Sequence, residues 1–324
     1  MTPAAQHPAS PSNFREFHAM FPDDDHCIEY LAAWRWPDGF VCPRCSGRTA
    51  DRLKCRPLWE CRGCGRQTSA TAGTVMHRTR LPLSRWLYAI WQIAVRKVSI
   101  SAKQLQQEAG IGSYGSAWAL LHKVRLVLEE HDDAWLLHGD AVEVDETKIF
   151  GRGRPGGRIG RGLSVGSAWI VAAVERYERS RGSKTWQASG SARVEVIHDT
   201  TTTTLCGFVE RSAERGSLVV TDGWPAYNDI VTRGYVHEAT VLRKNHQLAK
   251  TVQPKVHLFF SNLKALLVGT FHGIDVAYMG RYLNEFLYRF NRRHLGARLF
   301  GYLVRRVIQG RWTSIPGLHP ESAG

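Results

Sequence analysis

Two pairs of cysteines at short, regular spacing constrain the fold of this chain more than any other feature. Cys42 and Cys45 are separated by two residues, as are Cys61 and Cys64, and fifteen residues lie between the pairs. Zn²⁺ prefers four tetrahedral ligands, and two CxxC loops supply them as two rigid halves. The spacing predicts a structural zinc site in a zinc ribbon over residues 14–75, which folds with its metal because so small a unit buries little apolar surface.

The chain is also strongly basic. Its 324 residues include 43 Lys and Arg against 29 Asp and Glu, a formal net charge of +14. The length suits two or three domains, and the charge favours a polyanionic partner, most commonly nucleic acid. A basic protein without such a partner is the alternative.

Residues 1–13 are polar and predict a flexible tail rather than a secretory signal. The apolar stretch 87–95 is too short to cross a bilayer, so no membrane partner is expected.

Residues 76–135 have a helical pattern and form the second predicted segment. The stretch from Ser101 to Trp118 is typical of a helix, a glycine turn at Gly110 and a second helix. Such a unit can place its second helix in the major groove of DNA, which would bring Lys123 and Arg125 close to the phosphates. A plain helical hairpin that supports the next domain is the competing interpretation.

Beyond residue 136 the pattern changes to that of an α/β domain. Strands are expected first, and helices then alternate with strands, an order that favours a sheet flanked by helices over a helical bundle. The expected strands are 142–150, 167–174, 192–198 and 218–221, and the expected helices begin near 201, 254 and 276.

Two aspartates on these strands are candidates for metal ligands. Asp145 lies in mid-strand, where Glu143 and Thr147 share its face, and a buried carboxylate there requires a partner. Asp222 follows a short buried strand, at the edge of the sheet where α/β proteins bind ligands. Hard divalent cations take carboxylate oxygens, so the two could share ions. A turn-forming role for Asp222, which precedes Gly223, is the alternative.

The helix expected from residue 254 to residue 267 contributes a third candidate. His257, Ser261 and Lys264 recur at helical spacing beside an apolar stripe, which suggests a site; a solvated polar edge would give the same pattern.

Together these motifs resemble the DDE-type insertion-sequence transposases that carry an N-terminal zinc ribbon, the ISXO-type group. The resemblance covers roughly residues 14–295. It rests on the order and spacing of motifs that are each weak alone: CPRC and CRGC, VEVDET, VTDGWPAY, NLKALLVGTFHG and RYLNEFLYRFNRR. Thirty-four residues lie between Asp222 and His257, similar to the family's gap between its second and third catalytic residues. The third position is usually Glu, whereas this chain has His257, which suits Mn²⁺ better than Mg²⁺. Glu285 could supply a carboxylate instead.

The resemblance implies an α/β ribonuclease-H-like catalytic core, with a mixed sheet flanked by helices, over residues 136–295, and a basic C-terminal tail over 296–324. Asp145, Asp222 and His257 would be the catalytic residues and would hold two Mg²⁺ or Mn²⁺ ions. DNA phosphates would be met by basic residues of several segments. These are Arg152, Arg154, Arg158 and Arg161 of a glycine- and arginine-rich loop, which a flexible linker would also explain, and Lys264, Arg289, Arg292 and Arg293, beside Lys123 and Arg125.

The expected function is that of a transposase that binds element ends and catalyses metal-dependent strand cleavage and strand transfer. Its partners would be the terminal inverted repeats and target DNA, and pairing two ends implies a homo-oligomer on DNA. A bacterial cytoplasmic location, on the nucleoid when DNA-bound, goes with this function. Three alternatives stay open: a catalytically inactive DNA-binding descendant, a structure-specific nuclease of the same fold, and a zinc-ribbon transcription factor or adaptor.

Overall fold

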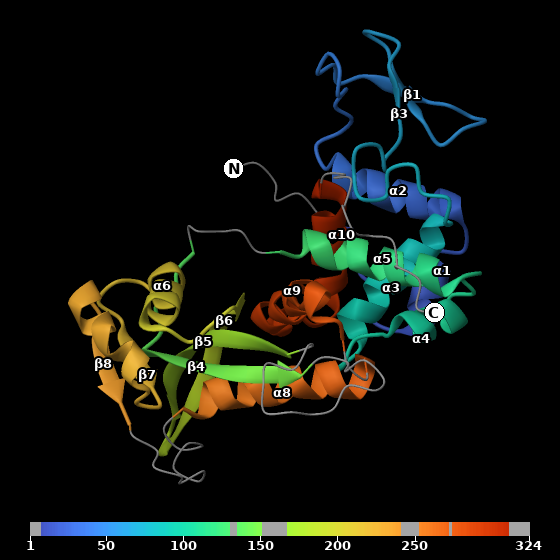
Figure 1. The fold of residues 1–324 in the computed structure, drawn as a ribbon. Helices are drawn as coiled ribbons and strands as arrows, with labels where there is room; N and C mark the ends of the chain where they lie inside the picture. The colour runs from blue at the N-terminus through green and yellow to red at the C-terminus, as the bar shows by residue number, and fades with distance from the viewer. Residues whose placement is uncertain (1–7, 130–134, 151–166, 241–252, 272–273, 311–324) are drawn as a thin grey trace. The chain divides into compact units, whose positions relative to one another are not determined.

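The computed structural model describes residues 8–129, 135–150, 167–240, 253–271 and 274–310. The chain divides into two compact units (Figure 1). Unit 1 combines the N-terminal segment up to residue 128 with the C-terminal segment from residue 293, and unit 2 is residues 129–292. Among the described residues, none of the helices combines the length and apolar character needed to cross a lipid bilayer.

Unit 1 consists of helices and a small sheet that carries the cysteine pairs. Three short antiparallel strands form this sheet, in the order β1-β2-β3. Two helices precede it, three follow it, and the C-terminal segment returns to add two more. The elements of unit 1 are α1 (Phe14–Met20), α2 (Asp24–Arg35), β1 (Ala50–Arg52), β2 (Trp59–Cys61), β3 (Gln67–Thr68), α3 (Leu83–Val95), α4 (Ala102–Glu108), α5 (Tyr114–Val127), η3 (Arg293–Arg298) and α10 (Leu299–Gln309).

Side-chain caps explain where several of these helices begin. The side chain of Asn13 accepts a hydrogen bond from an amide in the first turn of α1, and Asp23 does the same for α2. Ser101 begins α4 with a full capping box, because Gln104 also accepts from the Ser101 amide. The region predicted as the ribbon, 14–75, therefore begins with two capped helices. The sequence analysis did not predict them, because it assigned the region from its cysteine, tryptophan and arginine content.

The C-terminal segment forms a helix where the sequence predicted a basic tail over residues 296–324. Helix α10 buries Phe300, Leu303, Val304 and Val307 and packs against α2 and α3. Its arginines recur between these apolar positions, so one face enters the core of unit 1 while the other stays polar. The prediction of a tail was wrong for Leu299–Gln309, because the count of arginines masked the helical period; residues 311–324 lie outside the described part of the chain.

Helices α4 and α5 form the predicted pair around a glycine turn. Gly110 has a φ of +60°, which favours glycine, and Leu105 and Ile111 are buried on the inner face. Arg125, however, is only 1 % exposed, so the prediction that it contacts DNA is wrong for this structure. Helical phase places position 125 on the buried side of α5. Lys123 is half-buried, with its Nζ 6.0 Å from the ring centre of Trp86.

Unit 2 is built on a mixed five-stranded sheet in the order β6-β5-β4-β7-β8. Strand β5 is antiparallel to both of its neighbours, whereas β4, β7 and β8 run parallel to one another. The elements of unit 2 are β4 (Ala141–Phe150), β5 (Ser167–Arg181), β6 (Lys184–Ile197), α6 (Thr202–Ser212), β7 (Leu218–Thr221), η1 (Pro225–Arg233), β8 (Val236–Ala239), α8 (Pro254–Phe271), η2 (Val276–Tyr278) and α9 (Met279–Asn291).

Helices cover both faces of this sheet. On one face α8 and α9 pack through Phe259, Leu263 and Leu283 against Ile170 and Ala172 of β5. A second cluster fills the opposite face, where α6 and η1 pack over the strands; it includes Val142, Val144, Val171, Phe208, Val219 and Tyr227. The predicted mixed sheet with flanking helices is therefore confirmed, and the centre of the sheet, where β4 meets β7, lies between two apolar layers.

Several details of unit 2 differ from the prediction. Strands β5 and β6 form a long hairpin that reaches residue 181 and begins again at 184, well beyond the expected ends at 174 and 192. Polar residues on an exposed hairpin lack the apolar alternation that predicts a strand, because backbone pairing between the strands stabilises them rather than burial of side chains. Strand β8 was not predicted for the same reason, since most of its side chains are exposed.

Candidate active site and zinc centre

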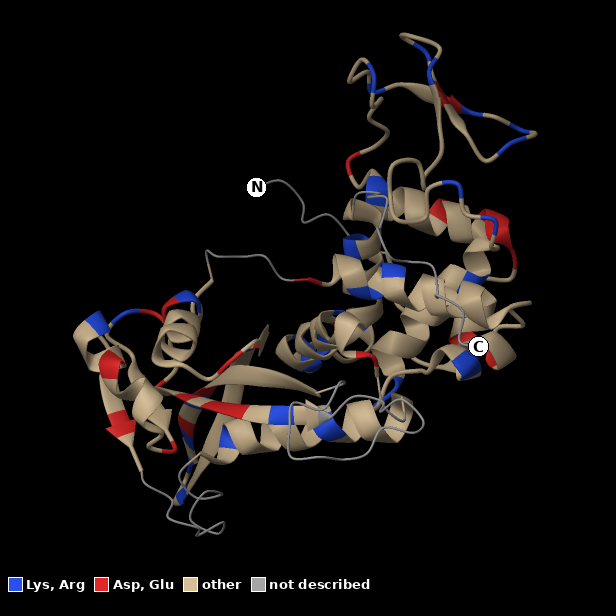
Figure 2. Ribbon diagram, in the orientation of Figure 1, with Lys and Arg blue, Asp and Glu red and all other residues tan. Residues whose placement is uncertain are grey.

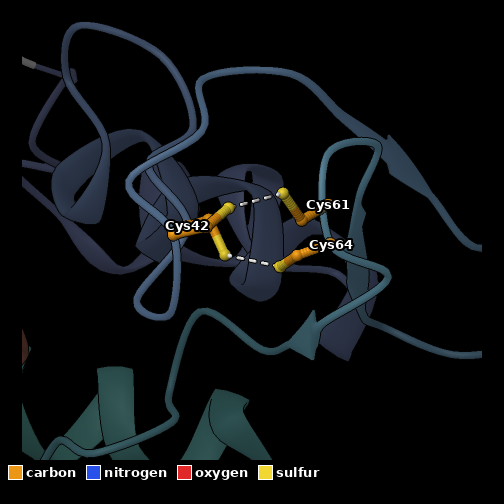
Figure 3. Close-up of side chains that lie close together, drawn as sticks. Cys42, Cys61 and Cys64 are labelled. Carbon is orange, nitrogen blue, oxygen red and sulfur yellow. Dashed lines mark hydrogen bonds between the residues drawn. The ribbon is translucent and has the colours of Figure 1, made fainter.

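The four cysteines predicted to bind zinc come together in unit 1 (Figure 3). Their sulfur atoms all lie within 4.8 Å of one another, and the pairs Cys42–Cys64 and Cys45–Cys61 are each 3.6 Å apart. A tetrahedron with Zn–S bonds of about 2.3 Å has edges of about 3.8 Å, so these separations match a tetrahedral Zn²⁺ centre. The cluster therefore fits a closed structural site, with no position left for catalysis.

Short backbone contacts hold the ribbon in this shape. The amide of Cys42 donates to the Gly47 carbonyl, and the amide of Arg44 donates to the Cys42 sulfur, which stabilises a thiolate. A Cβ atom at Gly47 would lie 3.3 Å from both the Cys45 and Cys61 sulfurs, so the knuckle has little room for a side chain. At the turn between β1 and β2, Lys54 and Arg56 are exposed, and Figure 2 shows basic residues there.

In unit 2, alternate residues of β4 meet successive turns of α8. The Glu143 carboxylate is fully buried and accepts hydrogen bonds from the amides of Lys255 and Val256, at 2.7 and 3.0 Å. It thereby satisfies free N–H groups in the first turn of the helix and places a negative charge at its positive end. Arg176 lies 3.4 Å from the other Glu143 oxygen. Glu143 thus fixes where α8 begins relative to β4.

Farther along the same face, Asp145 lies beside His257. Asp145 Oδ2 is 3.6 Å from His257 Nδ1, and Asp145 Oδ1 accepts from the Glu146 amide at 2.9 Å. The next residue on this face, Thr147, accepts a hydrogen bond from Lys264 Nζ at 2.8 Å. The alternation predicted for β4 and the helical spacing predicted for α8 thus bring four of the sequence-derived candidates onto one surface.

Asp222 approaches this surface from the neighbouring parallel strand. Strands β4 and β7 pair at Val142–Val219 and Glu143–Val220, so Asp145 and Asp222 occupy equivalent positions two residues past the last pair. The negative charge of Asp222 contributes to raising the pKa of Asp145, as expected for carboxylates in proximity. Asp222 also has the turn geometry considered above, because its Oδ1 accepts from the Trp224 amide at 3.0 Å. The turn leaves Oδ2 without a hydrogen bond from the described residues.

The site concentrates negative charge at a buried position. Burial, the charge of Glu146 and the charge of Asp222 together raise the pKa of Asp145 to about 8. Burial also raises the pKa of Glu146, although the hydroxyl of Tyr227, which donates to it at 2.7 Å, opposes that shift. A bound cation would reverse these shifts, because it stabilises the ionised carboxylates.

His257 faces this charge as a neutral imidazole. Burial lowers its pKa, so the 3.6 Å contact with Asp145 is not an ion pair near neutral pH. Its Nε2 atom is buried and has no hydrogen-bond partner among the residues that the structure describes. A buried polar atom without a partner is costly, and a neutral imidazole nitrogen is a common metal ligand.

The residues predicted to contact DNA are dispersed in the structure. Lys264 is exposed at the edge of the site. Arg292 stacks on the Tyr288 ring, with its guanidinium carbon 3.9 Å from the ring centre, and Arg293 is exposed in unit 1. The glycine- and arginine-rich loop with Arg152, Arg154, Arg158 and Arg161 lies outside the described residues.

A buried pair on α9 changes two further expectations. Glu285 is 1 % exposed and lies 3.6 Å from Arg289 one turn away. The two opposite charges offset each other at a position that solvent barely reaches. Arg289 is therefore held by Glu285 rather than placed to meet a phosphate, and Glu285 is held by Arg289 rather than placed to replace His257. Helical phase alone did not distinguish a buried ion pair from a site.

Comparison with known proteins identifies two domains in this chain. An ISXO2-like transposase domain matches residues 136–291, and a transposase zinc-ribbon domain matches residues 22–67. The chain belongs to the zinc-ribbon DDE transposases of insertion sequences. The first match contains β4 through α9, with every residue of the candidate site, and the second contains α2 and all four cysteines.

A curated relative is also encoded in a transposable element. The uncharacterized protein in transposable element ISH50 of Halobacterium salinarum is 24 % identical over 237 residues, which cover 67 % of this chain and 74 % of the relative. The search of solved structures returned no significant match.

Sequence patterns did not predict two groups beside the candidate site. Glu146 points to the opposite face of β4 from Asp145, yet its charge still acts on Asp145, and Tyr227 holds it. Gln253 precedes α8, is fully buried and donates to the carbonyls of both β4 and β7. The VEVDET motif contained a signal for Glu146, whereas no pattern in the sequence marks an isolated glutamine.

Proposed function

We propose that this protein is a DNA transposase that binds the ends of its element and catalyses metal-dependent strand cleavage and strand transfer. The observation that carries the proposal is the meeting of Asp145, Asp222 and His257 where β4, β7 and α8 converge. The strand order supports a ribonuclease-H-like core: β4 is central, the antiparallel β5 lies on one side, and the parallel β7 and β8 lie on the other.

The donor set fits divalent cations. Asp145 and Asp222 each have an oxygen that accepts no hydrogen bond from the described residues, and His257 Nε2 is buried without a partner. Carboxylate oxygens with one imidazole nitrogen suit Mn²⁺ or Mg²⁺, and the nitrogen favours Mn²⁺. When bound, such cations supply Lewis-acid activation of the attacking hydroxyl and charge stabilisation of the leaving oxygen.

The side chains of the protein would position the reacting strand. Glu143 holds the start of α8 against β4, which fixes His257 beside Asp145. Thr147 orients the Lys264 ammonium at 2.8 Å, where it would act as a point charge for a DNA phosphate. Positioning and charge neutralisation account for most of the catalysis in phosphoryl transfer, so a rigid sheet centre is a suitable support.

The rest of the chain would provide DNA affinity. The net charge of +14 favours phosphate contacts, and the ribbon with its exposed Lys54 and Arg56 is a candidate for recognising the terminal repeats, together with α4 and α5. Synapsis of two ends would require a homo-oligomer on DNA.

The decisive experiment is a cleavage and strand-transfer assay on duplexes that carry the element ends, with Mn²⁺ or Mg²⁺. Asp145→Ala and Asp222→Ala should abolish nicking, and His257→Ala should reduce it, whereas Asp229→Ala, a substitution of an exposed aspartate in η1, should cut normally. Normal cleavage by the Asp145 and Asp222 variants would refute the site. Cutting without joining would identify a nuclease, and tight end binding without any nicking would identify an inactive descendant.

A further inference from the structure

Around the start of α8, two buried polar atoms have no hydrogen-bond partner in the described part of the chain. They are Gln253 Oε1 and His257 Nε2. The Gln253 carbonyl accepts from the His257 amide at 3.3 Å, so Gln253 directly precedes the first turn of α8 and is bonded to it. His257 faces Asp145, and the Gln253 side chain contacts the strand that carries Asp145, so the two unpartnered atoms suggest one shared ligand.

The amide nitrogen of Gln253 bridges the two strands that carry the catalytic aspartates. Nε2 donates to the Val144 carbonyl at 2.8 Å and to the Val220 carbonyl at 2.9 Å. Val144 directly precedes Asp145, and Val220 lies two residues before Asp222. The paired register of β4 and β7 ends at Glu143 and Val220, so the glutamine side chain takes over the bonding where the strands stop pairing.

This bridge also settles which atom of the amide is the oxygen. Two carbonyl acceptors can be satisfied only by N–H groups, so Nε2 must face the strands and Oε1 must point elsewhere. In an amide the oxygen lies about 2.2 Å from the nitrogen, which places Oε1 within about 5 Å of both carbonyl oxygens. Gln253 is fully buried, so water in bulk solvent does not satisfy this oxygen.

We infer that Gln253 is a member of the metal centre: Nε2 sets the spacing of β4 and β7, and Oε1 provides a neutral oxygen ligand for a divalent cation held by Asp145 and Asp222. The inference rests on the proposed function above. Amide oxygens are ordinary ligands of hard cations. Gln253 would be the fourth donor, after Asp145, Asp222 and His257. His257 supplies a nitrogen in place of a third carboxylate, and the amide of Gln253 would add an oxygen ligand. Because this oxygen is neutral, it adds no charge to a site where the carboxylates already repel one another.

A pair of substitutions separates the ligand from a mere structural bridge. Gln253→Leu removes both the donor and the acceptor. Gln253→Glu removes the N–H donor and keeps an oxygen, which is now negatively charged. The carboxylate would repel the carbonyl oxygens of Val144 and Val220 but would attract a cation. If Oε1 is a ligand, Mn²⁺ affinity should fall about ten- to a hundred-fold in Gln253→Leu. The same affinity should return to the parent value or exceed it in Gln253→Glu.

The measurement is Mn²⁺ binding to the zinc-loaded full chain by titration calorimetry and by electron paramagnetic resonance of free Mn²⁺. Circular dichroism and zinc content verify folding, and Gln107→Leu, an exposed glutamine of α4, is the matched control. Parent-like affinity in Gln253→Leu would overturn the inference. So would an affinity in Gln253→Glu below that in Gln253→Leu, because only a bridge would be harmed more by the carboxylate.

A second readout uses the unsubstituted protein, so it does not depend on the folding of a variant. In a glutamine-labelled sample, Mg²⁺ should shift the side-chain amide resonance of Gln253, identified by its absence in Gln253→Glu. An unmoved resonance at saturating Mg²⁺ would also overturn the inference. Failure of the parent to bind Mn²⁺, or unchanged binding in Asp145→Asn, would instead refute the proposed metal centre itself.

Discussion

Metal binding to this site should expel a proton from Asp145. Its pKa in the metal-free protein is about 8, so about nine-tenths of the carboxyl groups are protonated at pH 7 and about one-tenth at pH 9. A carboxylate must lose its proton to ligate a cation. Mn²⁺ binding should therefore release about 0.9 proton from Asp145 at pH 7 and about 0.1 at pH 9. His257 adds little, because burial lowers its pKa.

The same linkage sets the pH dependence of affinity. Below pH 8 each pH unit should raise the apparent Mn²⁺ affinity about tenfold, and above it the increase should level off. Proton release is measured by titration calorimetry in buffers of different ionisation enthalpy, under argon to prevent Mn²⁺ oxidation. Asp229→Asn is the control and should release protons as the parent does. Tight binding at pH 7 with no proton release would refute the argument, because Asp145 would then already be ionised despite its burial beside Glu146 and Asp222.

Three further outcomes are expected. Because folding raises the pKa of Asp145, the metal-free protein binds more protons when folded and loses stability as pH rises from about 4 to about 8. Asp145→Asn should reduce this loss and leave the part due to Glu143 and Glu146, whose pKa values burial also raises; urea denaturation of the protein at both pH values measures the difference. Glu143→Ala leaves Arg176 and two helix amides without their carboxylate and should cost unit 2 about 3–5 kcal/mol in urea denaturation, with Glu143→Gln costing less. Cys61→Ser should eliminate zinc from the ribbon and expose it to protease while Mn²⁺ binding persists, and joint loss of both would contradict the separate units.

Unit 1 and unit 2 differ in how directly the sequence specified their sites. The zinc ligands were predictable because each CxxC loop is a local structure, and closing the site requires only one short hairpin between them. Asp145 and His257 were found through periods of two on a strand and of about 3.6 on a helix, which report local faces. Only the resemblance to a family predicted that the two residues lie close together. A local periodicity carries no information on contacts between residues more than a hundred positions apart.

Burial is the property that sequence patterns predicted least well. Arg125 and Arg289 were both expected to contact DNA, yet Arg125 is 1 % exposed and Arg289 pairs with the buried carboxylate of Glu285. A charged residue on a helix gives the same sequence signal whether it meets solvent, a phosphate or a buried partner. Only the packing of the neighbouring elements decides among these.

The sequence by itself therefore determined the zinc ligands, the faces of β4 and α8, and the family. The tertiary structure alone decided that Glu143 pins α8, that α10 returns to unit 1, and that Gln253 bridges β4 and β7. The physical reason is the sequence distance over which each feature acts. A periodicity or a spacing depends on backbone geometry within a few residues. The hydrogen bond from Gln253 to Val144 spans 109 positions and forms only after the sheet has assembled.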